Sequence, residues 1–221
     1  MANTIIVGFD TPFEPFSVLE NGVPSGITVE VAAAALARIG YQATFKPLAL
    51  DASEAALLSG EVDALAFKGI VDERRRIMDF SQPVVRTGAA LFARAGLAAT
   101  DTLAAFKGGS IATPRKGPLG AVIAREAPHI RIVATISYDD TLQAVADGAV
   151  DAAALNFHAA ARMIRKRFPE KFSMPAAPFL RIPLGFTVAK GKHAALLRAF
   201  DAALAELERE GELARIEKKW M

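Results

Sequence analysis

Two stretches of the sequence repeat each other and decide the fold: residues 58–66 read LSGEVDALA, and residues 146–154 read ADGAVDAAA. In both we expect an amphipathic helix to end, and Gly60 or Gly148 to supply its left-handed cap. Val-Asp-Ala would then open a short buried strand. The repeat predicts two similar α/β lobes. Helix-Gly-strand junctions are common in α/β folds, so chance similarity is the alternative.

Around the repeat, short Val/Ile-rich runs alternate with Ala/Leu-rich amphipathic stretches. Residues 4–8, 43–48 and 62–66 are predicted strands, and residues 27–39 and 52–59 are predicted helices. The 221 residues are 52% hydrophobic, which is ample for buried cores. The pattern therefore predicts an α/β protein with mostly parallel sheets.

The composition excludes several functional classes. There are 26 Lys and Arg residues against 24 Asp and Glu, so the net charge of +2 indicates no nucleic-acid or membrane-surface partner. Without cysteine there is no disulfide, thiol nucleophile or Cys-ligated metal. The apolar run 88–99 is broken by Arg94 and falls short of the roughly 20 residues of a membrane-spanning helix. No signal-peptide pattern precedes the first strand, so we expect either a cytosolic protein or a mature one whose export signal has been removed.

The residues after the two repeated strands are the first candidates for a binding site. In open α/β sheets, ligands bind beyond the carboxyl ends of the strands. We expect the two strand ends to face each other across a cleft. The candidate ligand contacts there are Phe67, Lys68 and Gly69 in one lobe, and Asn156 with Phe157 in the other.

Arg74 lies shortly after the first of these strand ends, in the run DERRR of residues 72–76. An arginine that turns inward can bind a ligand carboxylate with both arms of its guanidinium group. A run of three arginines is also typical of a solvated helix face, and this alternative applies above all to Arg75 and Arg76.

Residues 111–119, IATPRKGPL, predict a strand, a tight turn and a helix that starts near Pro118. The start of a helix attracts anions, and Arg115 and Lys116 would reinforce this. The segment is no phosphate loop, because Gly-Lys-Ser/Thr is missing. A plain turn with two exposed cations is the alternative.

The loop 12–16, PFEPF, follows the first strand, and its prolines would hold Phe13 or Phe16 at the mouth of a pocket. Burial in the core is the alternative for either ring. The histidines show no metal-ligand spacing and no nucleophile motif, so we expect no catalytic residue, metal or cofactor. They are His129, His158 and His193.

In this order, these segments resemble the type II periplasmic solute-binding proteins, in particular the polar amino-acid-binding family (family 3) of ABC transporters. The resemblance covers nearly the whole chain. The segments that carry it are 12–17 with 22–30, then 59–63 with 72–83, and finally 183–191 with 210–220.

The resemblance implies a type II periplasmic binding protein fold, with two doubly wound α/β lobes and a two-strand hinge near 89–93 and 185–189. Residues 1–90 and 184–221 would form the first lobe, and residues 91–183 the inserted second lobe. Such proteins close around one small molecule and deliver it to the permease of an ABC transporter. The resemblance thus implies a periplasmic binding protein, which we expect to be a monomer.

At residue level, the resemblance implies that Arg74 grips the carboxylate of the ligand, that Phe13 packs on the ligand, and that Gly117 begins an anion-binding turn. Several positions depart from the family pattern. Asn156 stands where an Asp usually meets the ligand ammonium. Pro118 replaces a hydroxyl residue of the turn and removes a backbone donor. Leu50 occupies a position that is often Trp.

A further departure is Lys68, which together with Asn156 makes the expected pocket more cationic and less suited to an ammonium group. We therefore expect a small organic acid or an amino-acid derivative rather than an ordinary α-amino acid. Two other functions are alternatives. One is the ligand-sensing input domain of a signalling protein. The other is an enzyme like cyclohexadienyl dehydratase, which would need an acid where Asn156 supplies only an amide.

Overall fold

The computed structural model describes residues 3–220 and divides into two compact units. Met1–Arg86 and Pro183–Met221 form the first unit, and Thr87–Ile182 form the second. The chain passes into the second unit after Arg86 and returns after Ile182. The lobe limits drawn from the sequence, after residues 90 and 183, and the hinge beside them stay a prediction.

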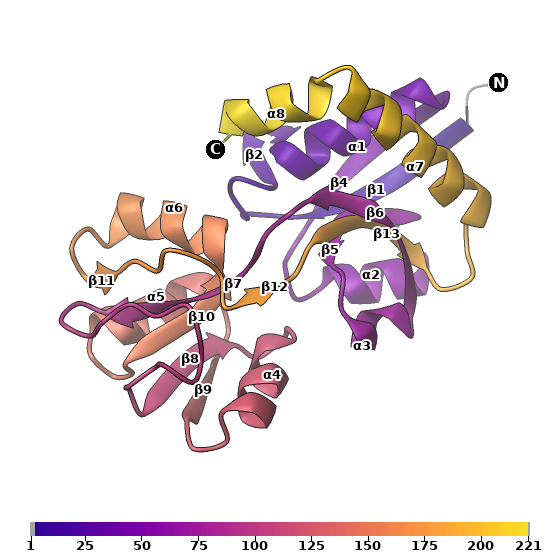
Figure 1. Ribbon diagram of the computed structural model, residues 1–221. Helices are drawn as coiled ribbons and strands as arrows, with labels where there is room; N and C mark the ends of the chain where they lie inside the picture. The colour runs from indigo at the N-terminus through magenta and orange to yellow at the C-terminus, as the bar shows by residue number, and fades with distance from the viewer. Residues whose placement is uncertain (1–2, 221) are drawn as a thin grey trace. The chain divides into compact units, whose positions relative to one another are not determined.

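The first unit is built on a five-stranded sheet in the order β4-β1-β5-β13-β6. Its strands are β1 (Asn3–Asp10), β4 (Tyr41–Leu48), β5 (Ala64–Gly69), β6 (Met78–Val85) and β13 (Leu184–Ala189). β2 (Val18–Glu20) and β3 (Val23–Ser25) form a separate hairpin. Its helices are α1 (Ile27–Arg38), α2 (Ser53–Ser59), α3 (Asp72–Arg75), α7 (Ala194–Arg209) and α8 (Glu212–Trp220). Helices α1, α7 and α8 group on one side of the sheet and α2 lies on the other, as Figure 1 shows.

The second unit contains a six-stranded sheet with the order β11-β7-β10-β8-β9, and β12 also pairs with β7. Its strands are β7 (Gly88–Arg94), β8 (Ser110–Pro114), β9 (Arg131–Thr135), β10 (Ala152–Asn156), β11 (Phe172–Ser173) and β12 (Leu180–Arg181). Its helices are α4 (Leu119–Glu126), α5 (Tyr138–Ala146) and α6 (Phe157–Arg167).

Most strands of each sheet run in one direction, which confirms the predicted mostly parallel α/β architecture. In the first unit β1 is parallel to both β4 and β5, and only β13 is reversed against β5 and β6. In the second unit β8, β9 and β10 are parallel, and β7 is the reversed strand. Both reversed strands are those by which the chain enters a unit from the other one.

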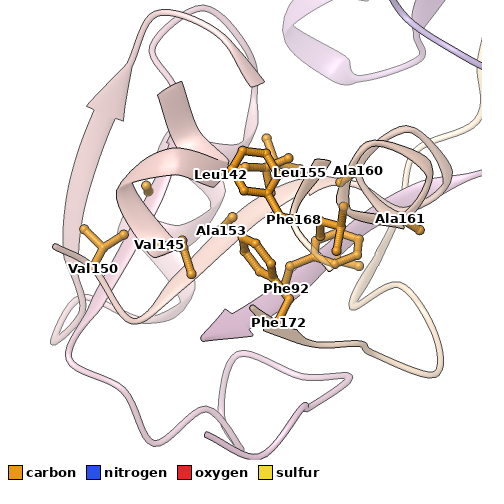
Figure 2. Packing of buried hydrophobic residues seen from close by; sticks show 13 residues of the cluster. Phe92, Leu142, Val145, Val150, Ala153, Leu155, Ala160, Ala161, Phe168 and Phe172 are labelled. Atoms are coloured by element: carbon orange, nitrogen blue, oxygen red, sulfur yellow. The ribbon is translucent and has the colours of Figure 1, made fainter. Parts of the chain in front are cut away.

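Strand β7 shows why helices cover both faces of the second sheet. Its successive side chains point to opposite faces. Ala90 and Phe92 belong to a cluster with Leu142 of α5 and Ile164 of α6. Figure 2 labels Phe92 and Leu142 of this cluster. Leu91, with its neighbours Ala89 and Ala93, packs in a second cluster with residues of α4. A strand that is apolar on both faces is typical of a doubly wound sheet.

The predicted repeat has the same hydrogen bonds in both units. Gly60 directly follows α2 and Gly148 follows the C-cap of α5, Asp147, and the two glycines adopt φ angles of 80° and 77°. The next two amides then bond to a single helix carbonyl, that of Ala56 at 2.9 and 3.3 Å in one copy and that of Ala144 at the same distances in the other. In both copies, an aspartate then accepts a hydrogen bond from a backbone amide of a neighbouring strand.

These aspartates are Asp63 and Asp151. The Asp63 carboxylate accepts a hydrogen bond from the amide of Ile6 in β1 at 2.8 Å. The Asp151 carboxylate accepts from the amide and the hydroxyl of Ser110 in β8, at 3.0 and 2.9 Å. These bonds outweigh the effect of burial and lower the pKa of Asp151. The two copies of the repeat therefore share one local structure.

Candidate functional site

Asp10 and Lys68 form a buried ion pair at the carboxyl ends of β1 and β5. The Lys68 ammonium lies 2.8 Å from Asp10 Oδ2, and the two side chains are only 4% and 2% exposed. The other carboxylate oxygen, Asp10 Oδ1, is buried and has no hydrogen-bond partner among residues 3–220. An ionic group is thus built into the region where an open α/β sheet binds its ligand.

Three phenylalanine rings surround this strand end. Phe13 stacks on Phe67, with centroids 5.6 Å apart and an interplanar angle of 14°. The ring centroid of Phe16 lies 5.5 Å from that of Phe13 and 6.3 Å from that of Phe67. Phe13 is 9% exposed and Phe16 is fully buried. The structure therefore places Phe13, Phe16 and Phe67 together in the interior of the first unit, so that ligand contact by Phe13 stays a prediction.

Arg74 is the arginine of its run that turns toward the protein. Its Nε and Nη2 atoms lie 2.9 and 2.7 Å from Glu54 Oε1, and Nη1 donates to the carbonyl of Gly69 at 3.3 Å. The side chain is 17% exposed, whereas Arg75 and Arg76 are exposed. Glu54 and Gly69 therefore fix the guanidinium group beside the end of β5.

Leu50 lies in the short connection between β4 and α2 and is half-buried. The carbonyl of Leu48, two residues earlier, accepts a hydrogen bond from the amide of Thr11 at 3.0 Å. This bond fastens the connection to the loop that carries Phe13. Leu50 therefore belongs to the same end of the first sheet as the other predicted contacts of this unit.

In the second unit, Asn156 ends β10 and caps α6. Its Oδ1 accepts hydrogen bonds from the amides of His158 and Ala159, both at 3.1 Å. Its Nδ2 donates to the hydroxyl of Thr87 at 3.1 Å, and its backbone amide donates to the Tyr138 hydroxyl at 3.1 Å. Asn156 is thus held firmly at the predicted strand end, by both its side chain and its backbone.

His158 completes this network. Its Nδ1 lies 2.9 Å from the Thr87 hydroxyl, which also accepts a hydrogen bond from Asn156. Burial lowers the pKa of His158 from its usual 6.5. Burial therefore favours a neutral imidazole in the folded protein.

The predicted anion turn lies at the start of α4. Arg115, Lys116 and Gly117 are exposed, and Pro118 precedes the first helical residue, Leu119. The Arg115 amide donates to the carbonyl of Thr135 at 2.8 Å. A Cβ added to Gly117 would meet no atom within 4 Å, so there is open space beside this residue. Its role as an anion site stays a prediction.

Sequence reasoning missed Asp10, Glu54, Thr87 and Tyr138. Asp10 could have been found, because it follows a predicted strand, but the strand continues two residues beyond the predicted end at Gly8. The other three have no sequence signal, since they reach the site from elements that are far away along the chain. The ion pairs Asp10–Lys68 and Glu54–Arg74 also offset the cationic character that we inferred for this part of the site.

Comparisons with known proteins agree with this architecture. The model of the family "Bacterial extracellular solute-binding proteins, family 3" matches residues 5–221. The L-cystine-binding protein TcyJ of Escherichia coli (strain K12) is 28% identical over 226 residues, which cover 98% of this chain and 82% of that protein.

Two solved structures are similar over the whole chain. A histidine kinase sensor domain with similarity to periplasmic binding proteins has a TM-score of 0.89 and 28% identity, and the match covers 100% of this chain and 96% of that one. An ancestral arginine-binding protein bound to arginine has a TM-score of 0.86 and 25% identity, with 100% and 99% covered. Within residues 3–220, no helix is both long enough and apolar enough to span a membrane. By its fold and by the family match over almost its full length, the chain belongs to the bacterial extracellular solute-binding proteins of family 3.

Proposed function

We propose that this chain binds one small carboxylate-bearing molecule and that the guanidinium group of Arg74 grips the ligand carboxylate. The observation that carries the proposal is the fixed position of this group beside the end of β5, held by Glu54 and Gly69. A guanidinium group that is already oriented loses little freedom when it binds an anion. Its partial exposure leaves room for such an anion.

The ligand we favour is an organic acid or an amino-acid derivative. An Asp at position 156 would offer a charge to an α-ammonium group, whereas Asn156 offers none. Its amide is moreover engaged with Thr87 and with the start of α6. A ligand without an α-ammonium group avoids the free-energy cost of moving that positive charge from water into a site that offers it no counter-charge.

We propose an extracytoplasmic role in uptake, in which the two units together enclose the ligand and present it to the permease of an ABC transporter. The ligand would stabilise the closed arrangement of the two units only to the extent that it binds the closed arrangement more favourably than the open one. The similarity to a cystine-binding protein supports a binding role. We propose no catalytic role, since an amide at position 156 cannot exchange protons with a substrate.

Sensing is the second candidate function. The sensor domain of a histidine kinase, at a TM-score of 0.89 and 28% identity, favours it. Deletion of the gene separates the two roles. Loss of uptake of the radiolabelled ligand by the cells would support transport, whereas normal uptake with a lost transcriptional response would support sensing.

Thermal unfolding against a panel of small molecules tests the proposed binding function. The panel contains organic acids, N-acylated and deaminated amino acids, and the standard amino acids. A ligand at 100 times its Kd stabilises the folded state by about 2.7 kcal/mol, which a melting curve resolves easily. We expect a shift with an organic acid or a derivative. A shift with standard amino acids alone would contradict the ligand class, and a panel without any shift would contradict the binding function.

A further inference from the structure

The Asp10–Lys68 ion pair bears on which ligands the chain can bind. A carboxylate that is 2% exposed needs a counter-charge, because a buried charge without a partner is strongly unfavourable. Lys68 supplies this charge from within the chain, at 2.8 Å. The pair is electrically neutral, although it consists of two full charges.

The position of the pair connects it with ligand binding. Asp10 is the last residue of β1, and Lys68 directly precedes Gly69, the last residue of β5. Arg74, which we propose as the grip for the ligand carboxylate, donates to the carbonyl of Gly69. The pair and the guanidinium group thus lie at the same end of the same sheet.

The unpartnered oxygen marks the acidic side of the pair as incomplete. Asp10 Oδ1 is buried and accepts no hydrogen bond from any of residues 3–220. Buried carboxylate oxygens are normally hydrogen-bonded, and an exception calls for an explanation. An acidic site that is made for two donors but filled by one lysine accounts for this arrangement.

We propose that Lys68 is a specificity-determining residue, a built-in cation that occupies an acidic subsite at Asp10 and thereby excludes ligands with a cationic second group. The inference rests on the proposed binding function. The wild-type chain would accept carboxylates whose far end is neutral. Without the lysine side chain, the same subsite would take up the cation of a ligand.

Two probes that differ by a single charge test this preference. 4-Guanidinobutyrate and 4-ureidobutyrate share a carboxylate and nearly the same shape, but only the former carries a guanidinium group. Neither has an α-ammonium group, so Asn156 does not bias the comparison. We expect the wild type to bind the ureido compound at least as well. In Lys68→Ala we expect the guanidino compound to bind about 10- to 100-fold more tightly than the ureido compound, the range of a charged hydrogen bond.

A second measurement does not depend on any ligand. Lys68→Ala lacks the atoms of a propylammonium ion, so propylammonium chloride should raise the melting temperature of this variant more than sodium chloride does. The matched control is the double variant Asp10→Asn with Lys68→Ala, in which the acidic subsite is gone and the rescue should disappear. If Lys68→Ala does not fold unaided, refolding with and without propylammonium replaces the melting curve.

The possible outcomes separate this proposal from the binding function. A guanidino preference in the wild type would overturn the proposal. The proposal would also be overturned if Lys68→Ala showed no preference for the guanidino compound and no response to propylammonium, provided that the double variant folds. If no carboxylate binds to the wild type, the proposed function fails, and the propylammonium experiment alone then decides whether Lys68 fills an acidic subsite.

Discussion

Asn156 combines a structural and a proposed functional role in one side chain. Its oxygen caps α6 and its nitrogen holds Thr87, so the same residue fixes the end of β10 and determines the charge there. Asp is as good a helix cap as Asn. The capping of α6 alone therefore does not require Asn at this position.

We predict that Asn156→Asp changes ligand preference and leaves the fold intact. The new carboxylate should favour an α-amino acid over the α-hydroxy acid with the same side chain by about tenfold, because it adds a charged hydrogen bond to the ammonium group. Titration calorimetry with both compounds measures this preference. Asn156→Ala is the control, which should lose about 1 kcal/mol of stability with its cap and gain no such preference. An unchanged preference in Asn156→Asp would show that residue 156 does not contact the ligand.

We predict that His158 makes the folded protein less stable in mild acid. Its pKa is lowered in the folded state, so the unfolded chain binds more protons between the unfolded pKa of 6.5 and the lower folded value. The free energy of unfolding therefore falls as the pH drops through this window. Urea unfolding at about pH 7.5 and about pH 5 should show a smaller loss for His158→Gln than for the wild type. The raised pKa of Asp201 is common to both proteins and cancels in the comparison. Equal losses would mean that His158 does not titrate differently on folding.

At the scale of elements, the repeat is the part of the fold that the sequence predicts best. A glycine at positive φ, a buried valine and an aspartate that accepts backbone amides form a local unit, and all of its members lie within a few residues. Local physical requirements of this kind leave a pattern in the sequence. The parallel direction of most strands follows from the same alternation of helices and strands.

The candidate site was only partly predictable, for a physical reason. Arg74 could be singled out from its run and from the nearby strand end, and Asn156 from its place after a strand. Which charged residues pair with each other could not be predicted, because Asp10 and Lys68 are separated by 58 positions and Glu54 and Arg74 by 20. Which charged side chains form ion pairs depends on the order and register of the strands, and a local sequence pattern predicts neither.

We predict that Gly60→Ala destabilises the protein by about 1 kcal/mol, because alanine resists the left-handed conformation at φ 80°. No atom lies within 4 Å of the added Cβ, so the cost comes from the backbone alone. Urea unfolding measures it. Gly120→Ala in the first turn of α4 is the matched control, since its Cβ makes only an ordinary contact at 3.8 Å and alanine favours helices. Equal effects of both substitutions would contradict the role of Gly60 as a helix cap.

At the scale of the whole molecule, membership in family 3 settles the class of protein, while the ligand depends on a few side chains. The first unit contributes an oriented guanidinium group and a neutral ion pair, and the second contributes a neutral amide. Under the proposed function, these groups would favour a carboxylate without further cations. The same set of groups would serve uptake and sensing equally well.

The most direct test of the central claim is titration calorimetry of Arg74→Ala with the ligand found by thermal unfolding, next to the wild type and Arg76→Ala. Arg76 is an exposed neighbour of the same charge and serves as the matched control. Loss of a charged hydrogen bond worth about 1.5–3 kcal/mol should weaken binding by Arg74→Ala about 10- to 100-fold. Binding by Arg76→Ala should be unchanged, and both variants should stay folded. If Arg74→Ala binds as tightly as the wild type, Arg74 does not grip the carboxylate, and the proposed mode of binding is wrong.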